Sequence, residues 1–218
     1  MRLGDAAKRM FDVITSAVLL VLLTPLLTWI AIAIKLDSRG PVLYRCRRVG
    51  FRGREFAMLK FRKMRADALG PALTVAKDER FTRIGRFLSA TKLDELPQLW
   101  HVFRGQMSLV GPRPEDPEFV SLFGDDYAPI LEVRPGITGL CQLAFAKEAS
   151  LLDPTQRLNH YVETLLPQKM ALDRLYASKH SFAMDVRILA WTTRAVVLRH
   201  NVAVHRDTGE LSSRRPRH

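Results

Sequence analysis

The chain has 218 residues, a formal charge of +12 at neutral pH and a sequence pI near 10.3. This length fits one domain, with or without an appended segment, and argues against two large domains, while the charge implies an anionic partner such as nucleic acid, an anionic membrane surface or a phosphorylated small molecule. The two cysteines, Cys46 and Cys141, are far apart and form no CxxC or Cys/His cluster, which argues against a disulfide framework or a structural zinc site and fits a reducing compartment.

Residues 13–34, VITSAVLLVLLTPLLTWIAIAI, form an apolar run without a charge. As a helix this run would reach about 33 Å, which is enough to cross a bilayer. Basic residues flank it on both sides: Lys8 and Arg9 before it, and Lys35, Arg39, Arg45, Arg47 and Arg48 after it. The positive-inside bias therefore pulls both ends toward the cytoplasm.

Thr24 and Pro25 lie near the middle of the apolar run. Proline removes the helical bond to the carbonyl of Val21 and kinks the helix there, and the hydroxyl of Thr24 is available to a freed backbone group. A sharp kink would give a re-entrant hairpin, whereas a mild one would leave a spanning helix. In both cases we expect a membrane-bound protein with its bulk on the cytoplasmic side.

After Gly40-Pro41, residues 42–50 and 55–64 read as short β-like segments separated by the turn-forming FRGR, so they predict a basic hairpin. Apolar residues then recur at helical spacing in residues 78–91 and 94–103. The sequence thus predicts a hairpin followed by two helical segments.

The segments 107–117 and 133–144 are rich in glycine and proline and predict ordered loops with short extended pieces. Residues 155–179 have helical character, which Pro167 must interrupt or restart. Residues 185–199 predict an amphipathic helix that suits the membrane interface as well as a core. The residues beyond 200 read as a basic, disordered tail.

Asp94 and Glu95 stand in the stretch TKLDELPQLW, and two interpretations of them are open. In the first, Asp94 caps a helix, Glu95 is its first residue and Pro97 sits in the first turn, where its missing N–H costs nothing. In the second, a carboxylate at a helix N-terminus attacks phosphorus to form an acyl phosphate while its neighbour holds Mg²⁺.

Many cations surround the pair in the sequence: Lys60, Arg62, Lys63, Arg65, Arg83, Arg86, Lys92 and Arg113. Most single charges of this kind are solvated surface groups. Arg113 is different, because prolines on both sides fix its backbone and reduce the entropy lost when its guanidinium binds a phosphate.

The motifs LDELPQLW, MSLVGPRP and VRPGITGL, in this order and preceded by KRMFD, an apolar segment with a central proline and LKFRKMR, resemble the bacterial monotopic phosphoglycosyl transferases. The resemblance runs from about residue 8 to about residue 197. Members transfer a sugar 1-phosphate from a nucleotide sugar, usually a UDP-sugar, to polyprenol phosphate and release UMP. They act at the first membrane step of glycoconjugate assembly, such as exopolysaccharide, capsule, O-antigen or glycoprotein glycan.

The resemblance implies that Asp94 is the nucleophile, which forms a covalent phosphosugar, and that Glu95, together with Asp94, binds the Mg²⁺ cofactor. It points to Lys60 and Arg113 as residues linked to the active site and makes Asp173 a plausible member, with Tyr176 on the same helical face. Arg62, Lys92 and Arg134 complete the predicted phosphate-binding or substrate-binding set, although a loop role is equally open for Arg134.

Taken together, these features predict a mainly α chain with short β-strands, of the α+β class. Residues 1–38 are expected to form the re-entrant membrane hairpin, residues 39–200 a small cytoplasmic catalytic domain with interfacial amphipathic helices, and residues 201–218 the tail. We expect this protein at the bacterial inner membrane, with membrane lipids as partners. Homo-oligomerisation is left open.

The chain departs from the family pattern near the acidic pair and in one loop. Many members have arginine where Ser89 stands and serine where Lys92 stands, so Lys92 is expected to supply the displaced charge as a point charge without a bidentate fork. Cys141 replaces a frequent tryptophan, and Thr24 replaces a serine while retaining the hydroxyl.

Three alternatives compete with a covalent transferase. A non-catalytic basic membrane scaffold would recruit anionic partners, and a one-step displacement would proceed through a ternary complex. Binding to nucleic acid is disfavoured by the apolar segment and by the lack of a recognisable binding motif. The sequence does not name the sugar or the glycoconjugate.

Overall fold

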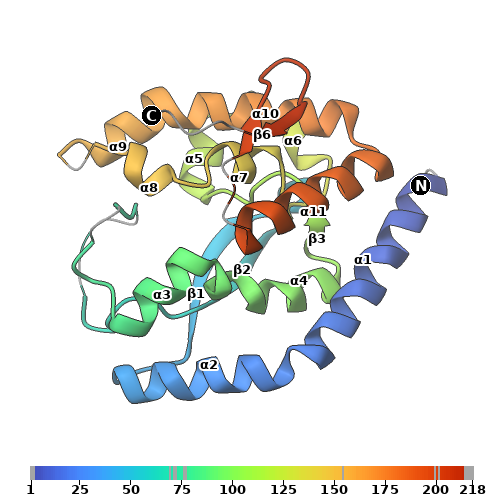
Figure 1. Cartoon of the computed structure of the whole chain (residues 1–218). Helices are drawn as coiled ribbons and strands as arrows, with labels where there is room; N and C mark the ends of the chain where they lie inside the picture. The colour runs from blue at the N-terminus through green and yellow to red at the C-terminus, as the bar shows by residue number, and fades with distance from the viewer. Residues whose placement is uncertain are drawn as a thin grey trace.

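The computed structural model describes residues 3–68, 70, 73–75, 78–153, 155–198, 200 and 202–213. This part of the chain is rich in α-helix and has three two-stranded sheets (Figure 1), which confirms the predicted α+β class at that level. The elements in chain order are α1 (Leu3–Leu22), α2 (Thr24–Asp37), β1 (Leu43–Val49), the 3-10 turn η1 (Phe51–Gly53), β2 (Glu55–Phe61), α3 (Arg83–Thr91), the 3-10 helix η2 (Leu93–Gln98), α4 (Leu99–Arg104), β3 (Ser108–Val110), α5 (Pro117–Leu122), α6 (Gly124–Leu131), β4 (Gly136–Thr138), α7 (Leu140–Ala144), α8 (Glu148–Leu151), α9 (Arg157–His160), the π-helical turn η3 (Tyr161–Leu165), α10 (Leu166–Lys179), α11 (Phe182–Val197), β5 (Val202–Val204) and β6 (Leu211–Ser213).

The apolar N-terminal run is broken where the sequence predicts a kink. Thr24 and Pro25 are the first residues of α2, and the hydroxyl of Thr24 donates to the carbonyl oxygen of Leu20 at 2.7 Å. In the described residues neither helix alone has the length and apolar character to cross a bilayer. The pair Ala6–Leu22 and Thr24–Asp37, bent by 60°, has both, as a broken span or a re-entrant loop, by length and composition.

The first half of α1 is attached to the globular part of the molecule. Arg9 donates to the carbonyl oxygens of Val102 at 2.7 Å and Phe103 at 3.0 Å, at the end of α4. Asp12 is buried and accepts the backbone N–H of Leu109 in β3 at 3.2 Å. The prediction assigned all of residues 1–38 to the membrane segment, but the polar start of α1 docks on the domain because these side chains find partners there.

β1 and β2 form the predicted hairpin, with Leu43 opposite Phe61 and Val49 opposite Glu55. The turn η1 reverses the chain, and Gly53 there has a φ of 72°, a left-handed conformation that glycine adopts without steric cost. The hairpin carries Lys60 near its end and delivers the chain toward α3.

The largest apolar cluster packs around the β3–β4 pair. These two strands are parallel, with Ser108 opposite Gly136 and Val110 opposite Thr138, so the two predicted glycine-proline segments meet as neighbours. Side chains from β2, α4, α7, α10 and α11 cover them. On α11 the fully buried Ile188 faces this core, while Phe182 and Val186 are exposed. The helix therefore has one face packed in the core and one exposed apolar face, and the sequence had left both a core role and a membrane-interface role open.

The prediction of a disordered tail from residue 201 is wrong for residues 202–213. β5 and β6 form an antiparallel hairpin, with Val202 opposite Ser213 and Val204 opposite Leu211. Val202 is buried in the main core, and Leu211 packs against it. Alternate apolar residues therefore give the hairpin one buried face, and residues 214–218 lie outside the described part of the chain.

Candidate active site

The carboxylate pair lies in the 3-10 helix η2, directly after α3. Lys92 joins the two elements in a left-handed conformation, with φ 60°, and its side chain makes no cap hydrogen bond. Asp94 is the second residue of η2 and is almost fully buried. The interpretation of Asp94 as the N-cap is therefore wrong, because the turn at Lys92 starts the helix and points the Asp94 carboxylate inward.

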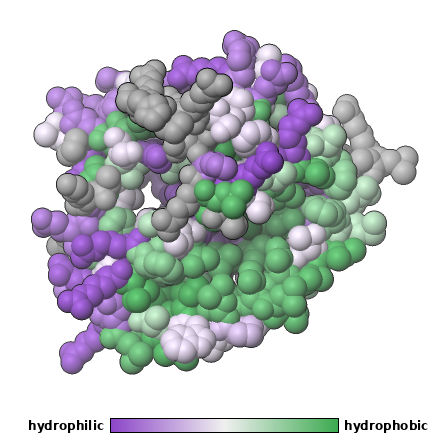
Figure 2. All heavy atoms as spheres, viewed as in Figure 1, coloured by the Kyte–Doolittle hydropathy of each residue, from purple (hydrophilic) through white to green (hydrophobic). Residues whose placement is uncertain are grey.

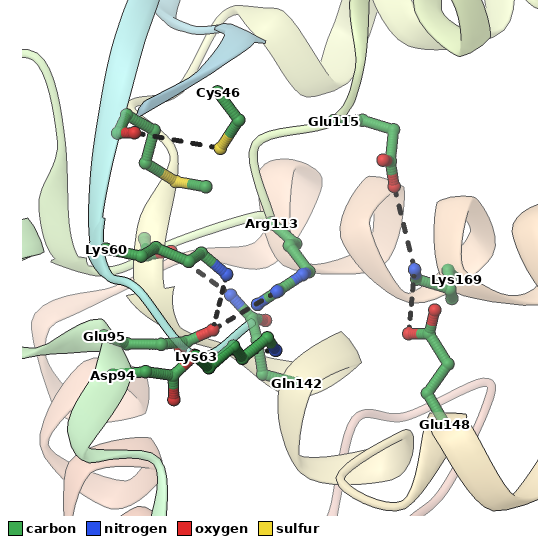
Figure 3. A network of polar contacts seen from close by, with 12 residues as sticks. Cys46, Lys60, Lys63, Asp94, Glu95, Arg113, Glu115, Gln142, Glu148 and Lys169 are labelled. Carbon is green, nitrogen blue, oxygen red and sulfur yellow. Dashed lines mark hydrogen bonds and ion pairs between the residues drawn. The ribbon is translucent and has the colours of Figure 1, made fainter. Parts of the chain in front are cut away.

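Two cations from other elements contact Glu95 (Figure 3). Lys60 Nζ donates to Oε1 of Glu95 at 2.9 Å, and Arg113 Nη2 donates to the same oxygen at 3.3 Å. Burial raises the pKa of Glu95, but the charges of Lys60 and Arg113 outweigh it and hold that pKa well below its usual range. Glu95 is therefore ionised at neutral pH, and the structure brings together three residues that the sequence predicted.

Asp94 has a different environment from its neighbour. Lys63 Nζ lies 3.6 Å from its Oδ2. Burial raises the pKa of Asp94, Lys63 opposes this rise, and the negative charge of Glu95 adds to it, so the net direction is upward. Burial also lowers the pKa of Lys63, although Asp94 partly offsets that effect. The two adjacent acids thus differ in protonation behaviour because their cation partners differ.

The loop that carries Arg113 depends on close backbone packing. Gly111 N–H donates to the carbonyl oxygen of Thr138 at 2.9 Å, and Gly136 N–H donates to that of Pro112 at 2.8 Å. A Cβ atom on Gly136 would lie 2.0 Å from the nitrogen of Gly111. This distance is too short for any side chain at position 136. Glycine at these positions lets the GPRP and RPGITG segments approach and fixes the base from which Arg113 reaches Glu95.

Asp173 lies behind Arg113 on α10. Burial raises the pKa of its carboxyl group to about 8, and its Oδ1 is buried without a hydrogen-bond partner among the described residues. The nearby Lys169 lowers the pKa but does not offset the burial. Tyr176, one turn further on, is buried and donates to Asp185 at 2.6 Å. Asp173 therefore lies close enough to Arg113 for the two residues to interact electrostatically.

Arg62 and Arg134 are not brought to the acidic pair. The guanidinium of Arg62 donates to the carbonyl oxygens of Ser38 and Arg39, where it ties the end of α2 to β2. Arg134 donates to the carbonyl oxygen of Gly105 at 3.1 Å and lies 5.0 Å from the ring centroid of Phe51. The predicted binding role of these two arginines has no support from their contacts, because both are engaged in joining elements.

Lys92 is exposed and acts on the acidic pair through its charge, which lowers the pKa of both Asp94 and Glu95. The cation in ion-pair contact with Asp94 is Lys63, which the sequence had shown only as one of many surrounding charges. Since β2 ends at Phe61, strand alternation no longer fixes the direction of side chains after it. The sequence thus gave no signal for this contact.

A second ionic group lies deeper in the fold, and sequence reasoning missed it (Figure 3). Lys169 Nζ lies 3.0 Å from Glu148 Oε2 and 3.7 Å from Glu115 Oε2, and it donates to the hydroxyl of Tyr161 at 2.7 Å. Tyr161 in turn donates to Glu115 at 2.7 Å. We call Glu115, Glu148, Tyr161 and Lys169 the inner network. Lys169 precedes Asp173 by four residues on α10, but this spacing does not point to Glu115 or Glu148, which lie in distant segments.

We call Lys60, Lys63, Asp94, Glu95 and Arg113 the outer network. It has three cations against two carboxylates, so it can attract and bind an anion such as a phosphate. In the described residues no group of three or more His, Cys, Asp or Glu side chains forms a complete metal site. Two adjacent carboxylates nevertheless fit Mg²⁺, which typically takes one or two carboxylates plus the oxygens of a substrate phosphate.

Comparisons with known proteins agree with this chemistry. The family model described as bacterial sugar transferase matches residues 3–199. The chain is 39% identical over 202 residues to the UDP-glucose:undecaprenyl-phosphate glucose-1-phosphate transferase of Caulobacter vibrioides, covering 90% of this chain and 72% of that protein. It is 38% identical over 203 residues to the undecaprenyl-phosphate glucose phosphotransferase of Komagataeibacter xylinus, covering 89% of this chain and 36% of that protein.

A third relative, the exopolysaccharide production protein PSS of Rhizobium leguminosarum bv. phaseoli, is 38% identical over 198 residues, covering 85% of this chain and 92% of the relative. The chain therefore spans most of the Caulobacter and Rhizobium proteins but only about a third of the Komagataeibacter protein. The matched region contains the outer network in full.

Proposed function

The chain belongs to the bacterial sugar transferase family, and from that premise we propose that it transfers a sugar 1-phosphate from a UDP-sugar to undecaprenyl phosphate, giving undecaprenyl-diphosphate sugar and UMP. This is the first membrane step of a glycoconjugate, and the name of the Rhizobium relative favours an exopolysaccharide. The observation that carries the proposal is the convergence of Lys60 and Arg113 on Glu95, beside a buried Asp94.

In the proposed mechanism Asp94 is the nucleophile. Its carboxylate oxygen attacks the phosphorus that bears the sugar, the bond from that phosphorus to the bridging oxygen breaks, and UMP leaves with the electron pair. A phosphate oxygen of undecaprenyl phosphate then attacks the same phosphorus and releases Asp94. The two steps together conserve the phosphoanhydride, since one is broken and one is formed.

Arg113, Lys60 and Glu95 have distinct roles in this proposal. Arg113 and Lys60 bind the diphosphate oxygens and stabilise the charge that develops on the leaving UMP. Glu95 orients these two cations and, with Asp94, would hold Mg²⁺. Bound there, Mg²⁺ would neutralise phosphate charge and polarise the phosphorus–oxygen bond.

We propose further that α1 and α2 form a re-entrant hairpin in the cytoplasmic membrane, with the active site on the cytoplasmic face. The 60° bend between Leu22 and Thr24 supports this. So does the broad apolar face in Figure 2, which covers the region where Figure 1 places α1, α2 and α4. The exposed apolar side chains on these helices include Val18, Val21, Leu22, Leu26, Trp29, Ile32, Leu36, Trp100 and Phe103. A site at this depth meets a soluble donor and a lipid acceptor together.

The test is product analysis with the purified protein, undecaprenyl phosphate, Mg²⁺ and a panel of UDP-hexoses and UDP-N-acetylhexosamines, beginning with UDP-glucose. We expect UMP release that requires both the matching donor and the lipid in multiple turnovers, and that stops when EDTA removes the metal. Release of UDP would indicate transfer of the sugar without its phosphate. Absence of both nucleotides with every donor would favour the non-catalytic scaffold.

A further inference from the structure

Lys63 is held against Asp94 by contacts on two sides. Its ammonium lies 3.6 Å from Oδ2 of Asp94 and 5.5 Å from the centroid of the Phe81 ring. The Lys63 side chain is 27% exposed, whereas that of Asp94 is 3% exposed. The Lys63 side chain is therefore more accessible to solvent than the carboxylate that it contacts.

The backbone of Lys63 is fixed by α3 and the segment before it. Its carbonyl oxygen accepts the N–H of Thr82 at 3.1 Å, and the adjacent Met64 bridges to Phe81. Gly85 of α3 packs directly on this carbonyl, since a Cβ atom there would lie 1.8 Å from it. A lysine side chain loses much rotamer entropy when ordered, and a fixed backbone reduces the freedom that remains to be lost.

The cations of the outer network divide between the two acids. Lys60 and Arg113 both contact Oε1 of Glu95, and Lys63 is the ion-pair partner of Asp94 in the described part of the chain. Figure 3 shows Lys63 beside Asp94, while the Lys60 and Arg113 side chains converge on Glu95. Each carboxylate therefore has its own cation or cations.

We propose that Lys63 is a catalytic residue that binds the phosphoryl group while the group is bonded to Asp94, an inference that rests on the proposed function. When the Asp94 oxygen bonds to phosphorus, the carboxylate loses its negative charge. The phosphoryl group keeps one negative charge on its two non-bridging oxygens, within a few bond lengths of the old position. The Lys63 ammonium can follow this charge through both transfer steps without a large movement, which is the preorganisation that favours charge stabilisation.

The test compares Lys63→Ala, Lys63→Gln and Lys63→Arg with the exposed-lysine control Lys147→Ala. We expect the first two to lose about 10²-fold in kcat, as on removal of one charge-stabilising donor, while the KM for the UDP-sugar changes less. Lys63→Arg should recover most of the loss because it restores the charge. Added methylammonium should raise the activity of Lys63→Ala and leave Asp94→Asn inactive.

Thermal unfolding of each variant separates chemistry from folding. A kcat for Lys63→Ala and Lys63→Gln within about threefold of the parent protein would overturn the role of Lys63 while leaving the proposed function standing. The role of Lys63 would also be overturned if Lys63→Arg were as impaired as Lys63→Ala and methylammonium restored nothing. Absence of UMP release by the parent protein itself would overturn the proposed function, and the role of Lys63 with it.

Discussion

The outer and inner networks are built from similar side chains yet differ in balance and exposure. In the outer network three cations face two carboxylates, and the side chains of Lys63 and Arg113 are 27% and 30% exposed. In the inner network a single lysine, 4% exposed, lies between two glutamates and a tyrosine hydroxyl. The first therefore has surplus positive charge open to a ligand, whereas the second is closed by its own partners.

The two networks are joined by the short loop that carries Arg113 and Glu115. Arg113 points outward to Glu95, while Glu115 points inward to Tyr161 and Lys169. Burial raises the pKa of Glu115, but Lys169 and Arg48 outweigh it and lower that pKa, so the inner carboxylate is ionised. The comparison indicates that the exposed surplus of positive charge serves binding, whereas the buried contacts of the inner network hold the loop in place.

Asp94→Asn should show the largest effect and break the outer network alone. We expect transfer activity to fall by at least about 10³-fold, because the nucleophile is lost. The thermal midpoint should not fall, since asparagine fits the same space and burial already disfavours the charged carboxylate. UMP release and thermal unfolding measure the two quantities, with the exposed Asp125→Asn as control.

Lys169→Met should break the inner network and show the opposite pattern. It leaves Glu115 and Glu148 without their shared cation, and removing one partner of a buried ion pair typically costs about 3–5 kcal/mol. We expect a large fall in the free energy of unfolding, measured in detergent. A variant as stable as the parent protein would show that the inner network is not structural.

Asp173 predicts how stability depends on pH. Its pKa is raised from 3.8 to about 8, so the folded chain holds this proton where the unfolded chain has lost it. The stabilisation is present below pH 4 and declines as pH rises toward 8, by about 2 kcal/mol between pH 6 and pH 8 for one such group. Unfolding measured across this range should show this slope in the parent protein, and Asp173→Asn should flatten it.

Thr24→Val should give the smallest effect. Because Thr24 belongs to neither network, this variant is a reference for the other predictions. It removes the hydrogen bond from the Thr24 hydroxyl to the carbonyl oxygen of Leu20, worth about 1 kcal/mol. We expect a slight fall in the thermal midpoint and nearly unchanged kcat. A loss of activity comparable with that of Asp94→Asn would show that the kink controls the chemistry directly.

Much of the outer network followed from the sequence, and the inner network did not. The pair Asp94-Glu95, the strand residue Lys60 and the proline-flanked Arg113 lie in local motifs whose chemistry can be recognised residue by residue. The inner network joins Glu115, Glu148 and Lys169 from three distant segments, and their contact depends on tertiary packing, to which local periodicity is blind.

The same limit explains the errors over the tail and over Arg62. The C-terminal segment contains many charges, yet Val202 and Leu211 supply enough apolar contact to order a hairpin against the core. Arg62 lies in a basic motif beside Lys60, but it follows the last residue of β2, where the strand's alternation ends and its side chain turns to backbone carbonyls. Composition alone favours disorder for such a tail and an exposed role for such an arginine, but the actual structure depends on the tertiary packing.

The most direct test of the central claim is intact-protein and peptide mass spectrometry after the protein meets the UDP-sugar and Mg²⁺ without the lipid acceptor. The account predicts one equivalent of UMP and one sugar phosphate attached to the peptide that contains Asp94, which disappears when undecaprenyl phosphate is added. The Asp94→Asn protein should carry no such adduct. UMP release that requires the lipid in the first turnover, with Asp94 unmodified throughout, would contradict it and indicate a single-step displacement.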